Sequence, residues 1–397
     1  MNKLDKISSE NDFIIPNYNE INLVDLAKTI YNRFGKKYEL TENIKQLNEL
    51  IPNNKHVLLI LSDGTGSNLI DKLDDNSILK QNKKRDIITI FPSTTGCVLT
   101  SLVTASYPIE HGIWGWFNYN RKFNRDYLPV LFRDRKSKND LTAFNIKSKD
   151  IFKIKSNLKE LNTKVNVLFP NYIIDSIYSK FVSYDSDRVA YENYDDIKNT
   201  MDNICKNYES SYTYLYLPFI DSCEHDNGID SDDVFIKLKE VNNLVEKLKE
   251  IKDLTIIFTA DHGQTNVYKD VVMDFQKYDK YFYAYPSIDC GTASYFIKEE
   301  LKEEFEKEFN NDFKDDMYLF KIEEFITNKI FGNSNYNEEA INNLGEYISI
   351  CKKGSFFINS PNKEDYLGKV KGNHSGLTKD EMIIPLIIID TNNKYLK

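Results

Sequence analysis

Several short segments of this chain are apolar at consecutive positions, and this pattern restricts its fold more than any other feature. Residues 56–61 are HVLLIL, and residues 254–259 are LTIIFT. A strand that is apolar at every position is buried on both faces, as in a parallel sheet covered by helices. The pattern therefore predicts strands at the centre of an α/β fold.

Further strands and helices are expected to alternate along the chain. The other strand candidates are residues 86–91, 165–169, 212–219, 292–297 and 382–389. Helical patterns cover residues 21–34, 95–105, 194–209, 231–252 and 297–309. In the last of these, Ile297, Leu301, Phe305 and Phe309 form one apolar stripe. This alternation predicts a doubly wound, mostly parallel central sheet with helices on both faces.

Two segments fit the alternating pattern poorly. Residues 121–161 are polar and rich in basic side chains, and residues 270–347 combine clustered aromatic side chains with acidic helices. Both are interpreted as insertions that cap a site at one edge of the sheet. Because no Pro/Gly-rich linker separates its parts, the chain is expected to form a single domain over residues 1–397.

Composition disfavours some classes of function. A net charge of −9 opposes stable nucleic-acid binding, since nucleic-acid binders gather Lys and Arg against phosphates. No stretch reaches the ~18 apolar residues of a membrane span, and the N-terminus lacks the apolar run of a signal peptide. The five widely spaced cysteines favour free thiols in a reducing compartment. We therefore expect a cytoplasmic protein without a membrane partner. Its oligomeric state does not follow from the sequence.

Chemically reactive side chains follow the two most apolar strands. Asp63 follows residues 56–61, and Asp261 and His262 follow residues 254–259. Ligands of α/β folds bind at the carboxyl ends of strands, and carboxylate and imidazole groups suit zinc or a similar metal. A turn or cap residue is the alternative for Asp63, and an Asp–His hydrogen bond is the alternative for the other pair.

Two more segments carry metal-binding side chains. Asp221 and His225 lie one helical turn apart after the strand at residues 212–219, and His374 lies in a glycine-flanked loop. Taken singly, these residues are also typical of surface positions. Three of the five histidines of the chain nevertheless fall in such segments, which indicates a shared site.

A hydroxyl group begins the helix predicted at residues 95–105. The sequence FPSTTG places Thr95 where free backbone N–H groups and the helix dipole favour a phosphate. Simple N-capping by Ser93, Thr94 or Thr95 is the alternative interpretation. The segment therefore offers a candidate nucleophile.

In this order the segments resemble the alkaline phosphatase superfamily, in particular its nucleotide pyrophosphatase/phosphodiesterase branch, over about residues 57–389. The resemblance implies two divalent metal ions, with zinc favoured and manganese as the alternative. It implies one ion held by Asp63, Thr95, Asp261 and His262, and a second held by Asp221, His225 and His374. Thr95 would be the nucleophile and would form a phospho-threonine intermediate, because counting back from the Y-P-x-x-H-G motif at residues 107–112 selects it, with Thr94 as the alternative if the alignment shifts by one residue.

The resemblance also implies the reaction class. A phosphodiesterase or nucleotide pyrophosphatase acting on a small phosphate ester is favoured, with a phosphomonoesterase or phosphonate hydrolase as the alternative. A sulfatase is opposed because Cys97 does not begin a C-x-P-x-R motif. A non-catalytic binding protein is disfavoured because all seven expected positions carry competent side chains.

The identity of the substrate is left open by three features. Nucleotide-cleaving relatives commonly have an aromatic residue directly after the nucleophile, where this chain has Gly96. Asn118 is the candidate donor of a hydrogen bond to the phosphate, and the alternative is an ordinary Asn in a loop. The basic stretch at residues 121–138 either attracts a polyanionic substrate or is solvated surface. Stacking on a nucleotide base would then fall to other aromatic side chains, for which the candidates are Trp114, Trp116, Phe117, Tyr172 and residues 281–285.

Overall fold

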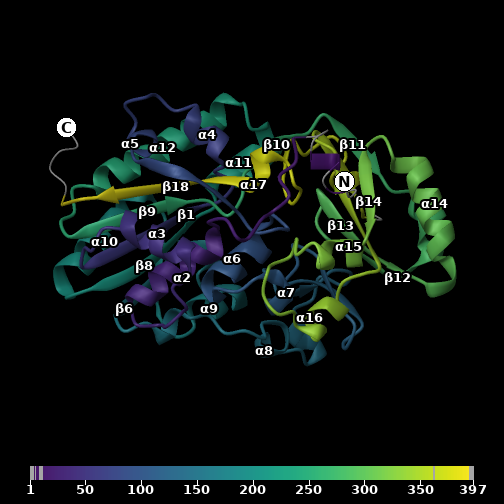
Figure 1. The fold of residues 1–397 in the computed structure, drawn as a ribbon, viewed down its shortest axis with the longest axis horizontal. Coiled ribbons are helices and arrows are strands. Elements are labelled where there is room, and N and C mark those ends of the chain that lie inside the picture. The colour runs from purple at the N-terminus through teal and green to yellow at the C-terminus, as the bar shows by residue number, and fades with distance from the viewer. Residues whose placement is uncertain (1–3, 5, 9–11, 361–362, 393–397) are drawn as a thin grey trace.

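The computed structural model describes residues 4, 6–8, 12–360 and 363–392, and a seven-stranded sheet forms its centre (Figure 1). In spatial order the strands are β2 (Lys83–Ile88), β18 (Ile383–Asp390), β9 (Leu254–Thr259), β1 (His56–Ser62), β8 (Ser211–Leu217), β6 (Lys164–Pro170) and β7 (Asp187–Tyr191). All neighbouring strands are parallel except β18, which is antiparallel to β2 and β9. The predicted mostly parallel sheet is confirmed.

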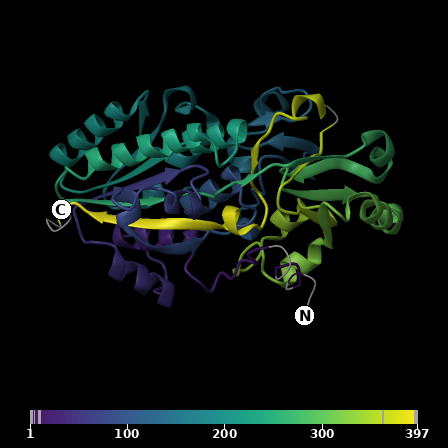
Figure 2. The ribbon, with the colours of Figure 1, turned by 90° about the horizontal axis from the view of Figure 1, so that it is seen from above.

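Helices cover both faces of this sheet (Figure 2). In β1, Val57, Leu59 and Leu61 pack into one hydrophobic cluster, and Leu58 and Ile60 pack into another. The first cluster lies against α2 (Leu23–Arg33), α3 (Glu42–Leu50), α6 (Thr95–Thr104) and α9 (Ile177–Ser183). The second lies against α4 (Ser67–Asp71), α5 (Ile78–Gln81), α10 (Tyr194–Asn207), α11 (Phe219–Asn227) and α12 (Asp232–Leu248). Both faces of β1 are therefore covered, which explains why its residues are apolar at consecutive positions.

A four-stranded antiparallel sheet lies beside the central sheet (Figure 1). Its order is β12 (Phe282–Ile288), β13 (Thr292–Ile297), β15 (Tyr347–Cys351) and β14 (Met317–Lys321). Helix α14 (Lys302–Phe313) packs on it through Phe305, Phe309 and Phe313. The segment 270–347, which fitted the central alternation poorly, supplies β12, β13 and β14 of this sheet and the first residue of β15.

The remaining elements are short. A three-stranded sheet is formed by β3 (Asn118–Asn120), β4 (Arg125–Leu128) and β5 (Arg133–Asp134). Two strand pairs are formed by β10 (Thr265–Asn266) with β17 (Gly372–Asn373) and by β11 (Lys269–Val272) with β16 (Ser355–Ile358). The other short helices are α7 (Pro108–His111), α8 (Ser148–Ile151), α13 (Phe275–Tyr278), α15 (Ile322–Thr327), α16 (Glu338–Asn342) and α17 (Lys379–Met382).

Two expectations about individual elements were wrong. The strand expected at 86–91 begins at Lys83, because β2 is an edge strand whose charged residues face solvent and obscure the apolar pattern. The helix expected at 297–309 begins at Lys302, since Ile297 pairs with Phe282 as the last residue of β13. The strand expected at 292–297 is confirmed as β13, and it belongs to the second sheet.

Two further observations concern the whole described chain. None of the described helices combines the length and the apolar character that crossing a bilayer requires. All five cysteines lie in described segments, and none forms a disulfide, as the sequence predicted. Cys97, Cys290 and Cys351 are buried.

Candidate active site

Three neighbouring strands end at the site. Strands β9, β1 and β8 are adjacent and parallel, so their carboxyl ends lie at one edge of the sheet. Asp261 and His262 follow β9, and Asp63 follows β1. Asp221 and His225 lie on α11, which begins two residues after β8. Residues that are far apart in the sequence thus meet because their strands are neighbours.

The first group of potential ligands is Asp63, Asp261 and His262. Their ligand atoms lie within 4.8 Å of one another. The His262 Nε2 atom is 3.5 Å from Asp63 Oδ1 and 3.6 Å from Asp261 Oδ2. Both carboxylate oxygens are buried without a hydrogen-bond partner among the described residues. Buried, unpaired carboxylate oxygens are costly unless a cation neutralises them, so this group fits a divalent metal ion.

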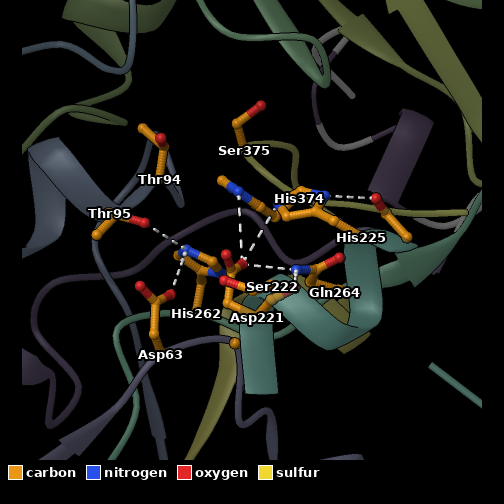
Figure 3. Close-up of polar contacts among 12 residues, drawn as sticks. Asp63, Thr94, Thr95, Asp221, Ser222, His225, His262, Gln264, His374 and Ser375 are labelled. Atoms are coloured by element: carbon orange, nitrogen blue, oxygen red, sulfur yellow. Dashed lines mark hydrogen bonds and ion pairs between the residues drawn. The ribbon is translucent and has the colours of Figure 1, made fainter. Parts of the chain in front are cut away.

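The second group contains Asp221, His374 and again His262, within the same 4.8 Å limit. Asp221 Oδ1 lies 3.8 Å from His374 Nε2 and 3.5 Å from His225 Nε2 (Figure 3). The rings of His262 and His374 stack with their centroids 3.9 Å apart. The structure thus brings together all the predicted Asp and His ligands, with His262 between the two groups.

All three histidines present the same ring nitrogen to the centre. In His225, His262 and His374 the Nδ1 atom donates to a backbone carbonyl oxygen. The acceptors are Gly372, Gly263 and Ser93, at 2.8, 3.2 and 3.0 Å respectively. Because a carbonyl only accepts, Nδ1 carries the proton, and each Nε2 lone pair remains available as a metal ligand.

Thr95 is the first residue of α6 and faces the first group (Figure 3). Its Oγ1 atom lies 3.3 Å from His262 Nε2. The neighbouring Thr94 is the N-cap residue, and its hydroxyl donates to Asp289 Oδ2 at 2.8 Å. Only the Thr95 hydroxyl is therefore directed at the ligand cluster, at a helix N-terminus that favours negative charge.

Burial shifts the pKa of two members of the cluster. It raises the pKa of Asp63 well above the ordinary range, and the charges of Asp261 and Asp221 raise it further. It lowers the pKa of His374 well below the ordinary range, and the neighbouring His262 and His225 lower it further. Burial and neighbouring like charges both disfavour the charged form of each group. A bound cation would stabilise the carboxylates.

A cavity of about 310 Å³ opens over the cluster. Thr95, Asp221, His225 and His374 line it on one side. The other lining side chains are mostly apolar and include Trp116, Phe117, Cys290, Phe356, Tyr366 and Val370. The cavity therefore combines potential metal ligands with a largely aromatic wall, as small-molecule sites commonly do.

Gly96 cannot be replaced by an aromatic residue without movement of its surroundings. A Cβ atom at Gly96 would lie 3.0 Å from Val130 Cγ2 and 3.4 Å from the Gly115 carbonyl oxygen. Of the aromatic candidates, Trp116 and Phe117 line the cavity. Trp114 and Tyr281 are buried in the core, and Tyr172 is 74% exposed.

Asn118 is not among the residues that line the cavity. Its side chain accepts from the Trp114 backbone N–H at 2.8 Å and donates to the Gly115 carbonyl at 2.7 Å. The side chain is buried and holds the turn that precedes β3. This geometry favours the alternative of an ordinary loop Asn over a phosphate donor.

The arginines of the basic stretch make internal contacts. Arg121 contacts the Leu344 carbonyl, Arg125 pairs with Asp134, and Arg135 donates to the Pro286 carbonyl. The Arg135 guanidinium also lies 3.8 Å from the centre of the Phe117 ring. None of these arginines lines the cavity among the described residues. The Arg125 pair lies within the three-stranded sheet, whereas the contacts of Arg121 and Arg135 join this stretch to the segment 270–347.

Two supporting residues were not found from the sequence. The Tyr216 hydroxyl donates to Asp63 Oδ2, and Gln264 Nε2 donates to Asp221 Oδ1 at 2.6 Å. Tyr216 lies in an apolar strand, where a tyrosine is ordinarily core. Gln264 lies two residues after His262, and this proximity was the only local indication of its role.

Comparisons of structure agree with this geometry. Human ectonucleotide pyrophosphatase/phosphodiesterase 5 gives a TM-score of 0.62 at 17% identity, covering 84% of this chain and 87% of that chain. The murine form gives 0.61 at 16% identity, covering 83% and 87%. Phosphonoacetate hydrolase from Sinorhizobium meliloti 1021, in complex with phosphonoacetate, gives 0.60 at 14% identity, covering 85% and 91%. These likenesses establish the fold.

Comparison of sequence establishes the family. No curated protein sequence matches this chain. The family model described as type I phosphodiesterase / nucleotide pyrophosphatase matches residues 57–374, which is more than half of the chain and spans all the predicted site residues. The chain therefore belongs to the type I phosphodiesterase/nucleotide pyrophosphatase family of the alkaline phosphatase superfamily, and it is a phosphoester hydrolase.

Proposed function

We propose that this protein hydrolyses small phosphodiesters, with Thr95 as the nucleophile. The observation that carries the proposal is the position of Thr95. Its hydroxyl lies 3.3 Å from His262 Nε2, at the N-terminus of α6 and on the wall of the 310 Å³ cavity. A nucleophile, potential ligands for two metals and a substrate-sized space thus meet at one point.

Two divalent metal ions are proposed as cofactors, with zinc favoured by the imidazole and carboxylate ligands and manganese as the alternative. The buried, unpaired oxygens of Asp63 and Asp261 support the first ion. One ion is assigned to Asp63, Thr95, Asp261 and His262, and the other to Asp221, His225 and His374. When bound, such ions lower the pKa of a ligand hydroxyl and neutralise charge on the phosphoryl oxygens.

The chain's own groups define the first chemical step. The Thr95 oxygen, having given its proton to solvent, attacks phosphorus, and a phospho-threonine forms. The bond to the leaving ester oxygen breaks with its electron pair on that oxygen, which takes a proton from water. Free N–H groups in the first turn of α6 stabilise the negative charge near Thr95. Water then hydrolyses the phospho-threonine and restores the hydroxyl. The aromatic wall, including Trp116 and Phe117, shields these steps from bulk water.

A nucleotide is one candidate substrate. An inactive form of the murine relative was crystallised with AMP, and the bacterial relative with phosphonoacetate. Phosphonoacetate hydrolysis is less well supported for this chain, because no Lys or Arg side chain lines the cavity in the described segments.

We further propose that segments 121–161 and 270–347 act as caps over the site. We also propose that the protein is cytoplasmic, which its free thiols support.

A substrate panel with a nucleophile variant tests the proposal. Zinc-loaded protein is expected to turn over bis-p-nitrophenyl phosphate faster than p-nitrophenyl phosphate. Thr95→Ala is expected to abolish turnover of both and to retain bound metal, while Thr94→Val retains measurable turnover because its hydroxyl is not directed at the cluster. A faster monoester reaction would support the phosphomonoesterase alternative, and an active Thr95→Ala variant would refute the assigned nucleophile.

A further inference from the structure

Asp289 adds a carboxylate to the cavity beyond the proposed metal ligands. It lies in the turn between β12 and β13, where its N–H donates to the Thr292 carbonyl at 2.9 Å. The same turn is fastened to the loop of His374, because Gly291 N–H donates to Ser375 Oγ at 2.9 Å. The second sheet thus delivers one acidic side chain to the wall of the cavity.

Two hydrogen bonds stabilise the ionised form of Asp289 against the effect of burial. Its Oδ2 atom accepts from the Thr94 hydroxyl at 2.8 Å, and its Oδ1 atom accepts from the Cys290 N–H at 2.9 Å. Burial raises the pKa of Asp289, whereas both hydrogen bonds lower it. Two bound divalent ions would act in the same direction as these hydrogen bonds and would hold Asp289 ionised.

No basic side chain offsets this charge. In the described ranges, Asp289 forms no ion pair, and no Lys or Arg lines the cavity. Arg135 is the arginine behind the cavity wall, but the Phe117 ring lies against its guanidinium. Two divalent ions would bring four positive charges, which Asp63, Asp221, Asp261 and an ionised Thr95 balance, and the buried Glu224 near Asp221 adds a further carboxylate. The Asp289 charge is then in excess, and it acts on whatever enters the cavity.

We propose that Asp289 is a specificity-determining residue that selects esters of low net negative charge. The inference rests on the proposed function and deepens it. A phosphodiester carries one negative charge and a phosphomonoester carries two near neutral pH, so the excess charge repels the monoester more strongly. An ester with a cationic substituent is favoured further, because the aromatic side chains of Trp116 and Phe117 also accommodate a cation.

A charge series with a common leaving group tests this proposal. The substrates are p-nitrophenyl phosphate, phenyl p-nitrophenyl phosphate and p-nitrophenylphosphorylcholine, with net charges of about −2, −1 and 0 from the ordinary ionisation of phosphate esters. In the wild type, kcat/KM is expected to rise along this series. In Asp289→Asn, kcat/KM for the monoester relative to the phenyl diester is expected to rise on the order of tenfold, as expected for loss of one nearby charge.

Direct binding gives a readout that is independent of turnover. Calorimetric titration of the metal-loaded protein with inorganic phosphate is expected to show tighter binding in Asp289→Asn, by a factor on the order of ten. Asp253→Asn is the matched control. It removes the same charge directly before β9, at the amino ends of the strands and away from the cavity. It is expected to leave the kcat/KM ratio and the phosphate affinity unchanged.

The outcomes separate the proposal from its rivals. The proposal is overturned if Asp289→Asn leaves the kcat/KM ratio and the phosphate affinity within twofold of wild type. It is also overturned if the variant lowers kcat/KM for all three substrates equally, because Asp289 then only holds Thr94. Asp289→Ser also removes the charge, and it provides the same comparison if the Asn amide of the first variant disturbs the turn between β12 and β13. If the wild type cleaves none of the esters, the proposed function fails, while phosphate binding still tests the Asp289 charge.

Discussion

Tyr216→Phe removes one hydroxyl from the support of the proposed metal site. That hydroxyl donates to Asp63 Oδ2, while Asp63 Oδ1 has no hydrogen-bond partner among the described residues and is directed at the ligand cluster. The hydrogen bond from Tyr216 lowers the pKa of Asp63 against the stronger effect of burial. Without it, Asp63 holds its proton more firmly, and a metal ion must displace that proton to bind.

The magnitude follows from the two states of Asp63. A hydrogen bond to an ionised group contributes about 1.5–3 kcal/mol, and one to a neutral group about 0.5–1.5 kcal/mol. The ionised form of Asp63 is the one that binds a metal ion, and it gains more from the Tyr216 hydrogen bond than the protonated form does, so Tyr216→Phe is expected to weaken binding by the difference, about 1–2 kcal/mol. This corresponds to a loss of roughly 5- to 30-fold in zinc affinity at neutral pH.

Competition with a chromophoric chelator measures this change. Tyr214→Phe is the matched control, because Tyr214 lies on the same strand and its buried hydroxyl has no hydrogen-bond partner among the described residues. The control is expected to bind zinc with wild-type affinity and to be at least as stable as the wild type. Equal zinc affinities for Tyr216→Phe, Tyr214→Phe and wild type would refute the assignment of Asp63 as a ligand supported by Tyr216.

Two further predictions concern His111 and Gly96. Burial lowers the pKa of His111 from 6.5 to about 3, so the folded state binds fewer protons than the unfolded state between these values. The contribution of His111 to the free energy of unfolding is therefore complete above pH 6.5, and it falls by up to about 1.4 kcal/mol per pH unit as the pH falls toward 3. Urea unfolding of His111→Gln should show a shallower dependence of this free energy on pH, and the same slope as in the wild type would contradict the prediction. Gly96→Phe should cost about 1–3 kcal/mol through contact with Val130, and a wild-type melting temperature would contradict the crowding at this position.

The local sequence identified Asp63, Asp261 and His262 because they follow the two most apolar strands of the chain. Strands β1 and β9 were visible from HVLLIL and LTIIFT, and their ends point to one edge of any parallel sheet. Asp63, Asp261 and His262 could therefore be assigned to one site before any distance was known. Asp221 and His225 were visible from their spacing of one helical turn after the strand that became β8, and the resemblance to the family grouped them with His374.

Other features depend on contacts between distant segments and were not visible locally. Asn118 follows the expected motif, but the backbone of Trp114 and Gly115 uses its amide. The helix expected at 297–309 was displaced because Ile297 pairs with β12, which a four-residue apolar spacing does not reveal. Long-range strand pairing overrides such local periodicity.

The sequence by itself determined the chemistry of this protein, since residue types and their places at strand ends fix which ligands and which nucleophile are available. Only the tertiary structure decided the rest. It separates Thr95 from Thr94, because one hydroxyl faces His262 and the other is held by Asp289. It also brings Tyr216 to Asp63 across 153 residues of sequence and Asp289 to the cavity from the second sheet. Such contacts depend on how strands and sheets pack, and no local pattern encodes that packing.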